Sequence, residues 1–291
     1  MTTHESWTEA QSKATVSVDG DERAVAYYEG GAEADEEEAT AAEPVVFLHG
    51  IPTWSFLWRD VAPDFAEETG RRVIAPDLLG YGNSDMADSF DRSIRAQEAM
   101  VDALLAELGI DGPFSVVAHD IGGGVALRLA AEHPERVERL VLSNAVCFDS
   151  WPVEFINDLG LPSKADREPE TVERELEQVF GGGVYGEPEA HRAFIDGMIE
   201  PWRSAAGRTS LVRNAVATNT NHTTSIDYGA ITAETLLLWG ADDVLQSIDY
   251  AERLADEVGG SARVEGLERA YHWVVEDRSE AYLAELVAFF G

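Results

Sequence analysis

Cysteine, lysine and long apolar runs are the scarce features of this 291-residue sequence. Its single cysteine, Cys147, excludes an intrachain disulfide, so nothing suggests a disulfide-stabilised secreted domain. No apolar run approaches the roughly 20 residues of a membrane span. The first 14 residues also lack the apolar core of a signal peptide. We therefore expect a soluble, cytoplasmic protein that does not bind membranes.

Basic charge is equally scarce. Lys13 and Lys164 are the only lysines. The chain has 21 lysine and arginine residues but 55 aspartate and glutamate residues, which gives a formal net charge of −34. A chain this acidic without a local basic patch is not expected to bind nucleic acid. The imbalance is typical of proteins from salt-accumulating halophiles, where molar salt shortens the Debye length to about 3 Å and screens self-repulsion. The alternative is an acidic protein of ordinary salt conditions.

Short apolar runs bounded by turn residues predict the strands of a sheet buried on both faces. These runs span residues 45–48, 73–75, 114–118, 140–142 and 236–239. Helix-like segments such as 92–108 alternate with them, which favours an α/β fold with a mostly parallel central sheet flanked by helices. Two alternating segments ahead of the first run, 14–18 and 24–28, predict an antiparallel hairpin at the sheet edge.

The strand pattern disappears in the middle of the chain, where residues 168–180 and 189–199 read as helices. Strand and helix alternation resumes at residue 234 and ends with a helix over 279–290. We interpret the middle as an inserted helical cap. The expected organisation is a first part of the core over 1–147, the cap over 148–229, and a second part of the core over 230–291.

The stretch Ala118-His119-Asp120-Ile121-Gly122 follows an apolar strand and opens a glycine-rich helix. It has the spacing small-x-nucleophile-x-small, in which small flanks are needed because the strand-to-helix turn is tight. Asp120 occupies the position of the nucleophile, and the helix N-terminus behind it favours its negative charge. The alternative is that Asp120 only caps the helix.

Three further segments place polar residues after predicted strands. His49-Gly50-Ile51-Pro52 follows the first buried strand, where a turning backbone could aim amides at a reaction centre. Asp243 follows the strand at 236–239, and His272 follows the strand-like piece at 262–265. Aspartate, aspartate and histidine therefore come in the chain order nucleophile, acid and base.

Residues 49–59, 75–85 and the stretch around Asp120 resemble the α/β-hydrolases of the haloalkane dehalogenase and epoxide hydrolase group, and the resemblance resumes over 236–276. It implies an α/β-hydrolase fold with a helical cap, no cofactor and no metal. By resemblance Asp120 is the nucleophile, His272 the base and Asp243 the acid that orients the base. Asn144 stands where some dehalogenases place the acid, and an amide cannot do that work, which favours Asp243.

The chemistry of a carboxylate nucleophile suits displacement at a saturated carbon. Asp120 is ionised at neutral pH and needs no base to attack, so the attack leaves an ester on its side chain. His272 then deprotonates the water that hydrolyses this ester, while the backbone amides of Ile51 and Ile121 form the oxyanion hole. The partners expected are therefore a small-molecule substrate and water.

The group that holds the departing halide is not evident near the nucleophile. Haloalkane dehalogenases use side-chain N–H donors there, and this chain has Ile51 and Ile121 at the two local positions. Trp151 and Trp202 are candidate donors from the cap, with simple packing as the alternative. Tyr185 is the candidate acid for an epoxide hydrolase. We expect hydrolytic dehalogenation of haloalkanes, with epoxide hydrolysis or a non-catalytic ligand-binding role as alternatives.

Overall fold

The computed structural model describes residues 2–31, 43–217 and 219–291. Within them one eight-stranded sheet has the order β1-β2-β4-β3-β5-β6-β7-β8. The pairs β1·β2 and β2·β4 are antiparallel and the other neighbours are parallel. The strands are β1 Gln11–Val18, β2 Asp21–Gly30, β3 Val45–Leu48, β4 Val73–Pro76, β5 Phe114–His119, β6 Val137–Ser143, β7 Glu234–Gly240 and β8 Ala262–Leu267. This confirms the predicted α/β-hydrolase fold class and the antiparallel hairpin at the sheet edge.

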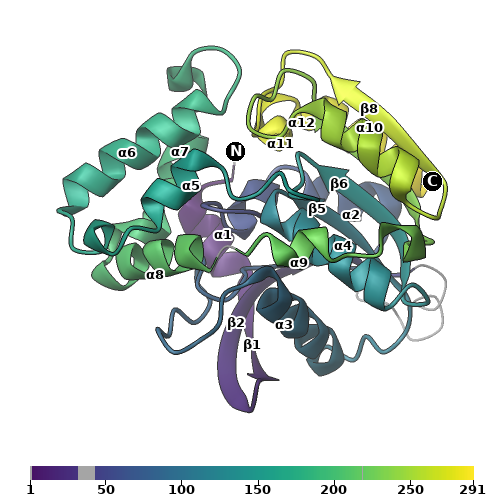
Figure 1. Cartoon of the computed structure of the whole chain (residues 1–291), viewed down its shortest axis with the longest axis horizontal. Coiled ribbons are helices and arrows are strands. Elements are labelled where there is room, and N and C mark those ends of the chain that lie inside the picture. The colour runs from purple at the N-terminus through teal and green to yellow at the C-terminus, as the bar shows by residue number, and fades with distance from the viewer. Residues whose placement is uncertain (1, 32–42, 218) are drawn as a thin grey trace.

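Helices cover the sheet, and α3 and α4 lie in front of it in Figure 1. The helices are α1 His4–Ala10, α2 Ala62–Thr69, α3 Ile94–Glu107, α4 Ile121–Glu132, α5 Glu154–Leu159, α6 Pro169–Gly182, α7 Arg192–Ile199, α8 Ala205–Val216, α9 Asn221–Thr224, α10 Ile248–Glu257, α11 Val274–Asp277 and α12 Ser279–Phe290. Short 3₁₀ turns occupy Ser55–Trp58, Pro162–Lys164, Pro188–His191, Glu200–Arg203 and Tyr228–Ala230. Every described helix is too short or too polar to cross a bilayer.

Burial explains why the central strands lack alternation. All residues of β3, β4 and β5 are buried, because helices cover both faces of the parallel part of the sheet. In the edge hairpin, β1 alternates between exposed and buried positions toward the tip, and the first four residues of β2 are exposed or half-buried. The parallel strands end at one edge, so the loops that follow β3, β5, β6 and β7 meet there.

Between β6 and β7 the described chain forms helices and turns, α5 to α9; in Figure 1, α5 to α8 gather at the left of the molecule, whereas α9 lies beside α4. Hydrogen bonds tie this segment to the core. The Trp54 indole donates to the Gly197 carbonyl at 2.9 Å, and the Trp202 indole donates to the Pro52 carbonyl at 2.9 Å. The segment therefore packs against the loop that follows β3. Its boundaries as a separate cap, residues 148 and 229, stay a prediction.

The N-terminal segment shows a feature that its polar sequence did not indicate. Residues His4–Ala10 form α1, whose Trp7 is 1% exposed and stacks on Tyr28 with ring centroids 4.5 Å apart. The Trp7 indole donates to the Ser55 hydroxyl at 2.9 Å. One buried aromatic side chain is thus enough to dock a short polar helix beside the loop after β3.

Candidate active site

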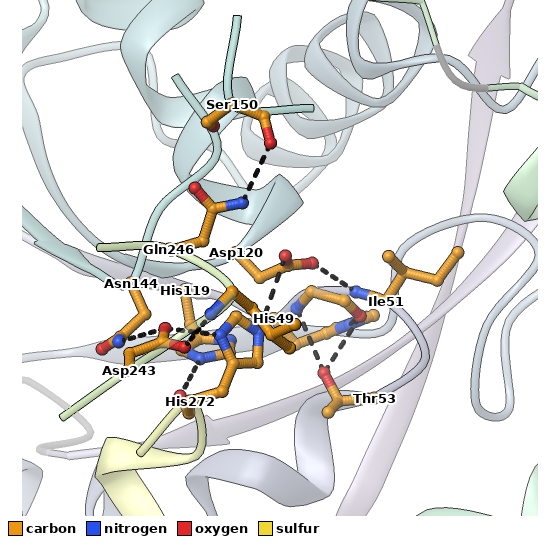
Figure 2. A network of polar contacts seen from close by, with 12 residues as sticks. His49, Ile51, Thr53, His119, Asp120, Asn144, Ser150, Asp243, Gln246 and His272 are labelled. Atoms are coloured by element: carbon orange, nitrogen blue, oxygen red, sulfur yellow. Dashed lines mark hydrogen bonds and ion pairs between the residues drawn. The ribbon is translucent and has the colours of Figure 1, made fainter. Parts of the chain in front are cut away.

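Asp120 lies at the sharp turn between β5 and α4, with a strained backbone at φ 52° and ψ −123°. The turn leaves no room for side chains behind it. A Cβ on Gly122 would lie 2.5 Å from the His49 carbonyl oxygen. The Asp120 side chain makes no N-capping hydrogen bond to α4, which disfavours a purely capping role. It points instead toward the loop after β3, as Figure 2 shows.

Two backbone amides meet the Asp120 carboxylate. The Ile51 amide donates to Asp120 Oδ1 at 2.8 Å, and the Ile121 amide begins α4 directly after Asp120. Burial raises the pKa of Asp120, while the charge of His272 and these two amides act in the opposite direction. Of the two amides predicted to form an oxyanion hole, that of Ile51 therefore binds a carboxylate oxygen of Asp120.

His272 connects Asp120 to Asp243. Its Nδ1 lies 2.9 Å from Asp243 Oδ2, and its Nε2 lies 3.7 Å from Asp120 Oδ2. Burial alone would lower the pKa of His272, but the charges of Asp243 and Asp120 outweigh it, so the pKa lies above its usual value. The pKa of Asp243 is lowered in turn: burial opposes ionisation, but His272 and other donors outweigh it. The structure thus brings the three predicted catalytic side chains into one chain of contacts.

Asn144, at the end of β6, holds Asp243. Its Nδ2 donates to Asp243 Oδ2 at 2.6 Å, and its Oδ1 accepts from the Gly240 amide at 3.0 Å. Asp243 Oδ1 accepts from the Leu245 amide at 2.7 Å. The acid thus has donors on both oxygens, and Asn144 serves as one of them. From the sequence, Asn144 could only be excluded as the acid; its hydrogen bond to Asp243 is seen only in the fold.

Two neutral histidines fix the backbone around the site. Burial lowers the pKa of His119 to about 3 and that of His49 to about 4. His119 Nε2 lies 2.9 Å from the His272 carbonyl oxygen and donates to it, since a carbonyl only accepts. His49 Nε2 accepts from the Leu78 amide at 2.9 Å, so its Nδ1 donates to the Gly50 carbonyl. His119 thus supports the backbone that carries His272.

A cavity of about 30 Å³ opens above Asp120 and His272. Its wall is mostly apolar and combines both parts of the core with the helical segment. The lining residues are Ile51, Pro52, Asp120, Trp151, Val153, Phe155, Ile156, Val179, Leu245, Gln246, His272 and Trp273. The cavity is small in this arrangement, so a substrate of several non-hydrogen atoms requires some movement of the wall.

The candidate donors from the helical segment lie in different places. Trp151 lines the cavity, and its Nε1 is buried without a hydrogen-bond partner among the described residues. Trp202 is buried, but its N–H is already bound to Pro52, and it is not among the cavity-lining residues described. Tyr185 is 39% exposed and packs on Tyr271 with ring centroids 5.2 Å apart. Of the three, only Trp151 presents an available polar hydrogen near Asp120.

The chain is similar in sequence and in fold to known proteins. A family model described as the alpha/beta hydrolase fold matches residues 43–279. Haloalkane dehalogenase 2 of Mycobacterium bovis is 26% identical over 85% of this chain and 88% of its own length. The structure of a haloalkane dehalogenase from Bradyrhizobium elkani superposes with a TM-score of 0.76 and 24% identity, over 96% of this chain and 97% of that one.

A different activity is attached to a second curated relative. Cis-3-alkyl-4-alkyloxetan-2-one decarboxylase of Xanthomonas campestris is 35% identical over 124 residues, which is 40% of this chain. The chain matches only 41% of that protein's length. The similarity is therefore higher but more local than that to the dehalogenase.

Proposed function

Because this chain belongs to the alpha/beta hydrolase fold family, we propose that it displaces halide from a saturated carbon through a covalent ester on Asp120. The observation that carries the proposal is a buried carboxylate, in place of a hydroxyl, at the strand-to-helix turn, with His272 Nε2 3.7 Å away. A carboxylate attacking an acyl group would give a strained mixed anhydride, so this site suits displacement better than ester cleavage. The full-length similarity to a dehalogenase supports the same choice.

The proposed reaction has two steps. In the first, an Asp120 oxygen forms a bond to the substrate carbon as the carbon–halogen bond breaks and halide leaves with the electron pair. In the second, His272 takes a proton from water, and the resulting hydroxide attacks the Asp120 carboxyl carbon. The Ile51 and Ile121 amides stabilise the oxyanion, whose collapse breaks the bond to the alkoxide; the alkoxide takes the proton of the added hydroxyl and leaves as the alcohol, Asp120 is restored as a carboxylate, and His272 releases its proton to solvent. Asp243 stabilises the imidazolium that forms on His272.

Trp151 is the proposed halide donor. Its buried indole N–H is unpaired among the described residues and lies in the same cavity as Asp120. A hydrogen bond to an anion contributes about 1.5–3 kcal/mol, so one such donor accelerates halide departure by roughly ten- to a hundredfold. We propose that residues 148–229 act as the cap that supplies it, with 1–147 and 230–291 as the core.

The structure offers less to epoxide hydrolysis. Tyr185 is largely at the surface, and the Tyr228 hydroxyl is held between the Thr223 carbonyl at 3.0 Å and the Phe148 amide at 2.8 Å. The cavity-lining residues described include no tyrosine to protonate an opening epoxide. A non-catalytic ligand-binding role would leave the strained turn and the Asp120, His272 and Asp243 contacts without a use.

Opening of an oxetan-2-one is the second candidate, favoured by the local similarity to the decarboxylase. Attack by Asp120 on the ring's saturated C4 breaks the C4–O bond and leaves a carboxylate on C3. Loss of carbon dioxide then forms a C3–C4 double bond and expels Asp120. No water is consumed in this sequence. His272 is therefore essential for turnover of a haloalkane but not for turnover of an oxetanone.

The test is intact-mass spectrometry of the His272→Ala variant in molar potassium acetate, after incubation with separate pools of bromoalkanes, epoxides and oxetan-2-ones. This variant attacks but cannot hydrolyse, so we expect a stable alkyl mass gain from bromoalkanes. The double variant with Asp120→Asn should show no gain. A hydroxyalkyl adduct from epoxides alone, or turnover of oxetanones without any alkyl adduct, would overturn the proposal in favour of that alternative. No adduct together with an inactive wild type would favour a binding role.

A further inference from the structure

Gln246 lies on the loop between β7 and α10, three residues after Asp243. Its main-chain carbonyl accepts from the Trp239 indole at 2.7 Å, and the next residue, Ser247, caps α10. The side chain lines the cavity and the residue is 1% exposed. Its backbone is therefore fixed by β7 on one side and α10 on the other, so the side chain meets the cavity from a rigid position.

The amide of Gln246 has one orientation that fits its surroundings. Its Nε2 faces the Ser150 carbonyl oxygen at 3.4 Å, as Figure 2 shows, and a carbonyl there needs a donor. Turning the amide over would set two oxygens against each other. Oε1 is consequently the other atom, and it is buried with no donor among the described residues.

An unpaired buried carbonyl oxygen is unusual. More than nine in ten buried polar groups have a hydrogen-bond partner, and leaving one without a partner is unfavourable. Apart from Gln246 itself, Asp120, His272 and the two tryptophans, the lining side chains are apolar. The Trp273 indole is already bound to the Phe180 carbonyl at 3.1 Å. Among the described lining residues, Trp151 and Gln246 thus each hold one buried polar atom without a partner, the indole N–H and Oε1.

We propose that Gln246 determines specificity by accepting a hydrogen bond from the substrate, and that the substrates are short haloalcohols rather than simple haloalkanes. This rests on the proposed dehalogenation at Asp120. The halogen lies against the Trp151 N–H, and a hydroxyl on the carbon chain donates to Gln246 Oε1. Hydrolysis breaks the carbon–halogen bond, so that the haloalcohol and one water molecule give a diol, a halide ion and a proton. The small cavity limits the chain to a few carbon atoms.

A matched pair of substrates tests this directly. In 3-bromopropan-1-ol a hydroxyl stands where 1-bromobutane has a methyl group, so the two molecules differ in little but the donor. Ester formation on Asp120 of the His272→Ala variant should favour the bromoalcohol by about tenfold or more in second-order rate, because only the hydroxyl pairs the buried oxygen. Equal rates, or a preference for 1-bromobutane, would overturn the proposal.

The variant Gln246→Met removes the acceptor at similar length. Combined with His272→Ala, it should abolish the preference by slowing the bromoalcohol while leaving or improving the rate with 1-bromobutane. Ile156→Val is the matched control, since it changes the apolar wall without touching a polar group, and it should preserve the ratio of rates. A purely structural role of Gln246 would slow both substrates equally, which would also overturn the proposal. Thermal unfolding of each variant separates misfolding from these effects.

A binding measurement on the wild type keeps the test independent of the chemistry. Ligand-observed NMR compares propane-1,3-diol with butan-1-ol, and then repeats both with Gln246→Met. If the wild type binds the diol more strongly than butan-1-ol and Gln246→Met loses this preference, the role of Gln246 is supported. Failure to release bromide in the same protein would then contradict the proposed dehalogenation but not the role of Gln246. Equal binding of the two probes to wild type and variant would overturn the role of Gln246.

Discussion

Replacing Asp243 with asparagine should slow the two proposed steps unequally. Asp243 Oδ2 receives both the Asn144 Nδ2–H and the His272 Nδ1–H, whereas Oδ1 receives only the Leu245 amide. In Asp243→Asn the amide oxygen will occupy the Oδ2 position, because two donors meet there. His272 therefore keeps its hydrogen bond and its tautomer but loses the negative charge that stabilises its protonated form.

The new NH2 group also faces the Leu245 amide, which lowers stability, but the effect on hydrolysis follows from the lost charge beside His272. A charge-assisted hydrogen bond is roughly twice as strong as a neutral one, so the imidazolium loses about 2 kcal/mol of stabilisation. Ester hydrolysis should slow by about 30-fold, since each 1.36 kcal/mol is worth a factor of about ten. Attack by Asp120 requires no base and should change less than about threefold. The ester should then accumulate during turnover.

The pH dependence gives a second readout with a defined sign. The charge of Asp243 raises the pKa of His272, and the base works only when it is neutral. Hydrolysis in the wild type therefore falls off as the pH drops below the pKa of His272 in the ester, where Asp243 is the charge that remains beside it. Removing the charge lowers that pKa, so the acidic limb in Asp243→Asn moves to lower pH although the plateau rate is smaller.

Rapid-quench intact-mass spectrometry with a bromoalkane measures both steps at once. Asp242→Asn is the control, because it removes the same charge from the neighbouring exposed residue, whose Oδ2 only accepts from the Arg269 amide at 2.9 Å. It should leave both rates near those of the wild type. Equal slowing of attack and hydrolysis in Asp243→Asn, or no accumulation of ester, would refute the assigned role of Asp243.

Three further predictions concern the turn, the halide and the solvent. Gly122→Ala should lower the melting temperature and the activity, because its Cβ would lie 2.5 Å from the His49 carbonyl oxygen. Gly182→Ala is the control: its Cβ meets nothing within 4 Å, so it should change neither the melting temperature nor the activity. Equal melting temperatures of the two variants would contradict this prediction. Trp151→Phe should slow ester formation from bromoalkanes by roughly ten- to a hundredfold without slowing hydrolysis of the ester once formed. Rapid-quench mass spectrometry measures both steps, and slowed hydrolysis with unchanged ester formation would contradict the role of Trp151. Dialysis from molar to millimolar potassium salt should lower the melting temperature, since the net charge is −34, and an unchanged value would refute adaptation to high salt.

The sequence predicted those features whose physical cause is local. A strand buried on both faces must be apolar throughout, so β3 appeared at Val45–Leu48 with its bounds intact. A tight turn excludes side chains next to it, so Gly122 marked the position of Asp120. The chain order of Asp120, Asp243 and His272 then pointed to one edge of the sheet, because parallel strands end together there.

Tertiary structure decided which polar groups are already paired. The indole N–H of Trp202 donates to a carbonyl 150 residues away, whereas the buried N–H of Trp151 has no partner in the part of the chain that the structure describes, and the two residues look alike in the sequence. The buried oxygen of Gln246 likewise depends on Ser150, which lies 96 residues earlier in the chain. Local pattern fixes burial and turns, but hydrogen-bond pairing depends on which distant segments the fold brings together. The position of the predicted nucleophile could thus be inferred from sequence, while the pairing of the polar groups around it could not.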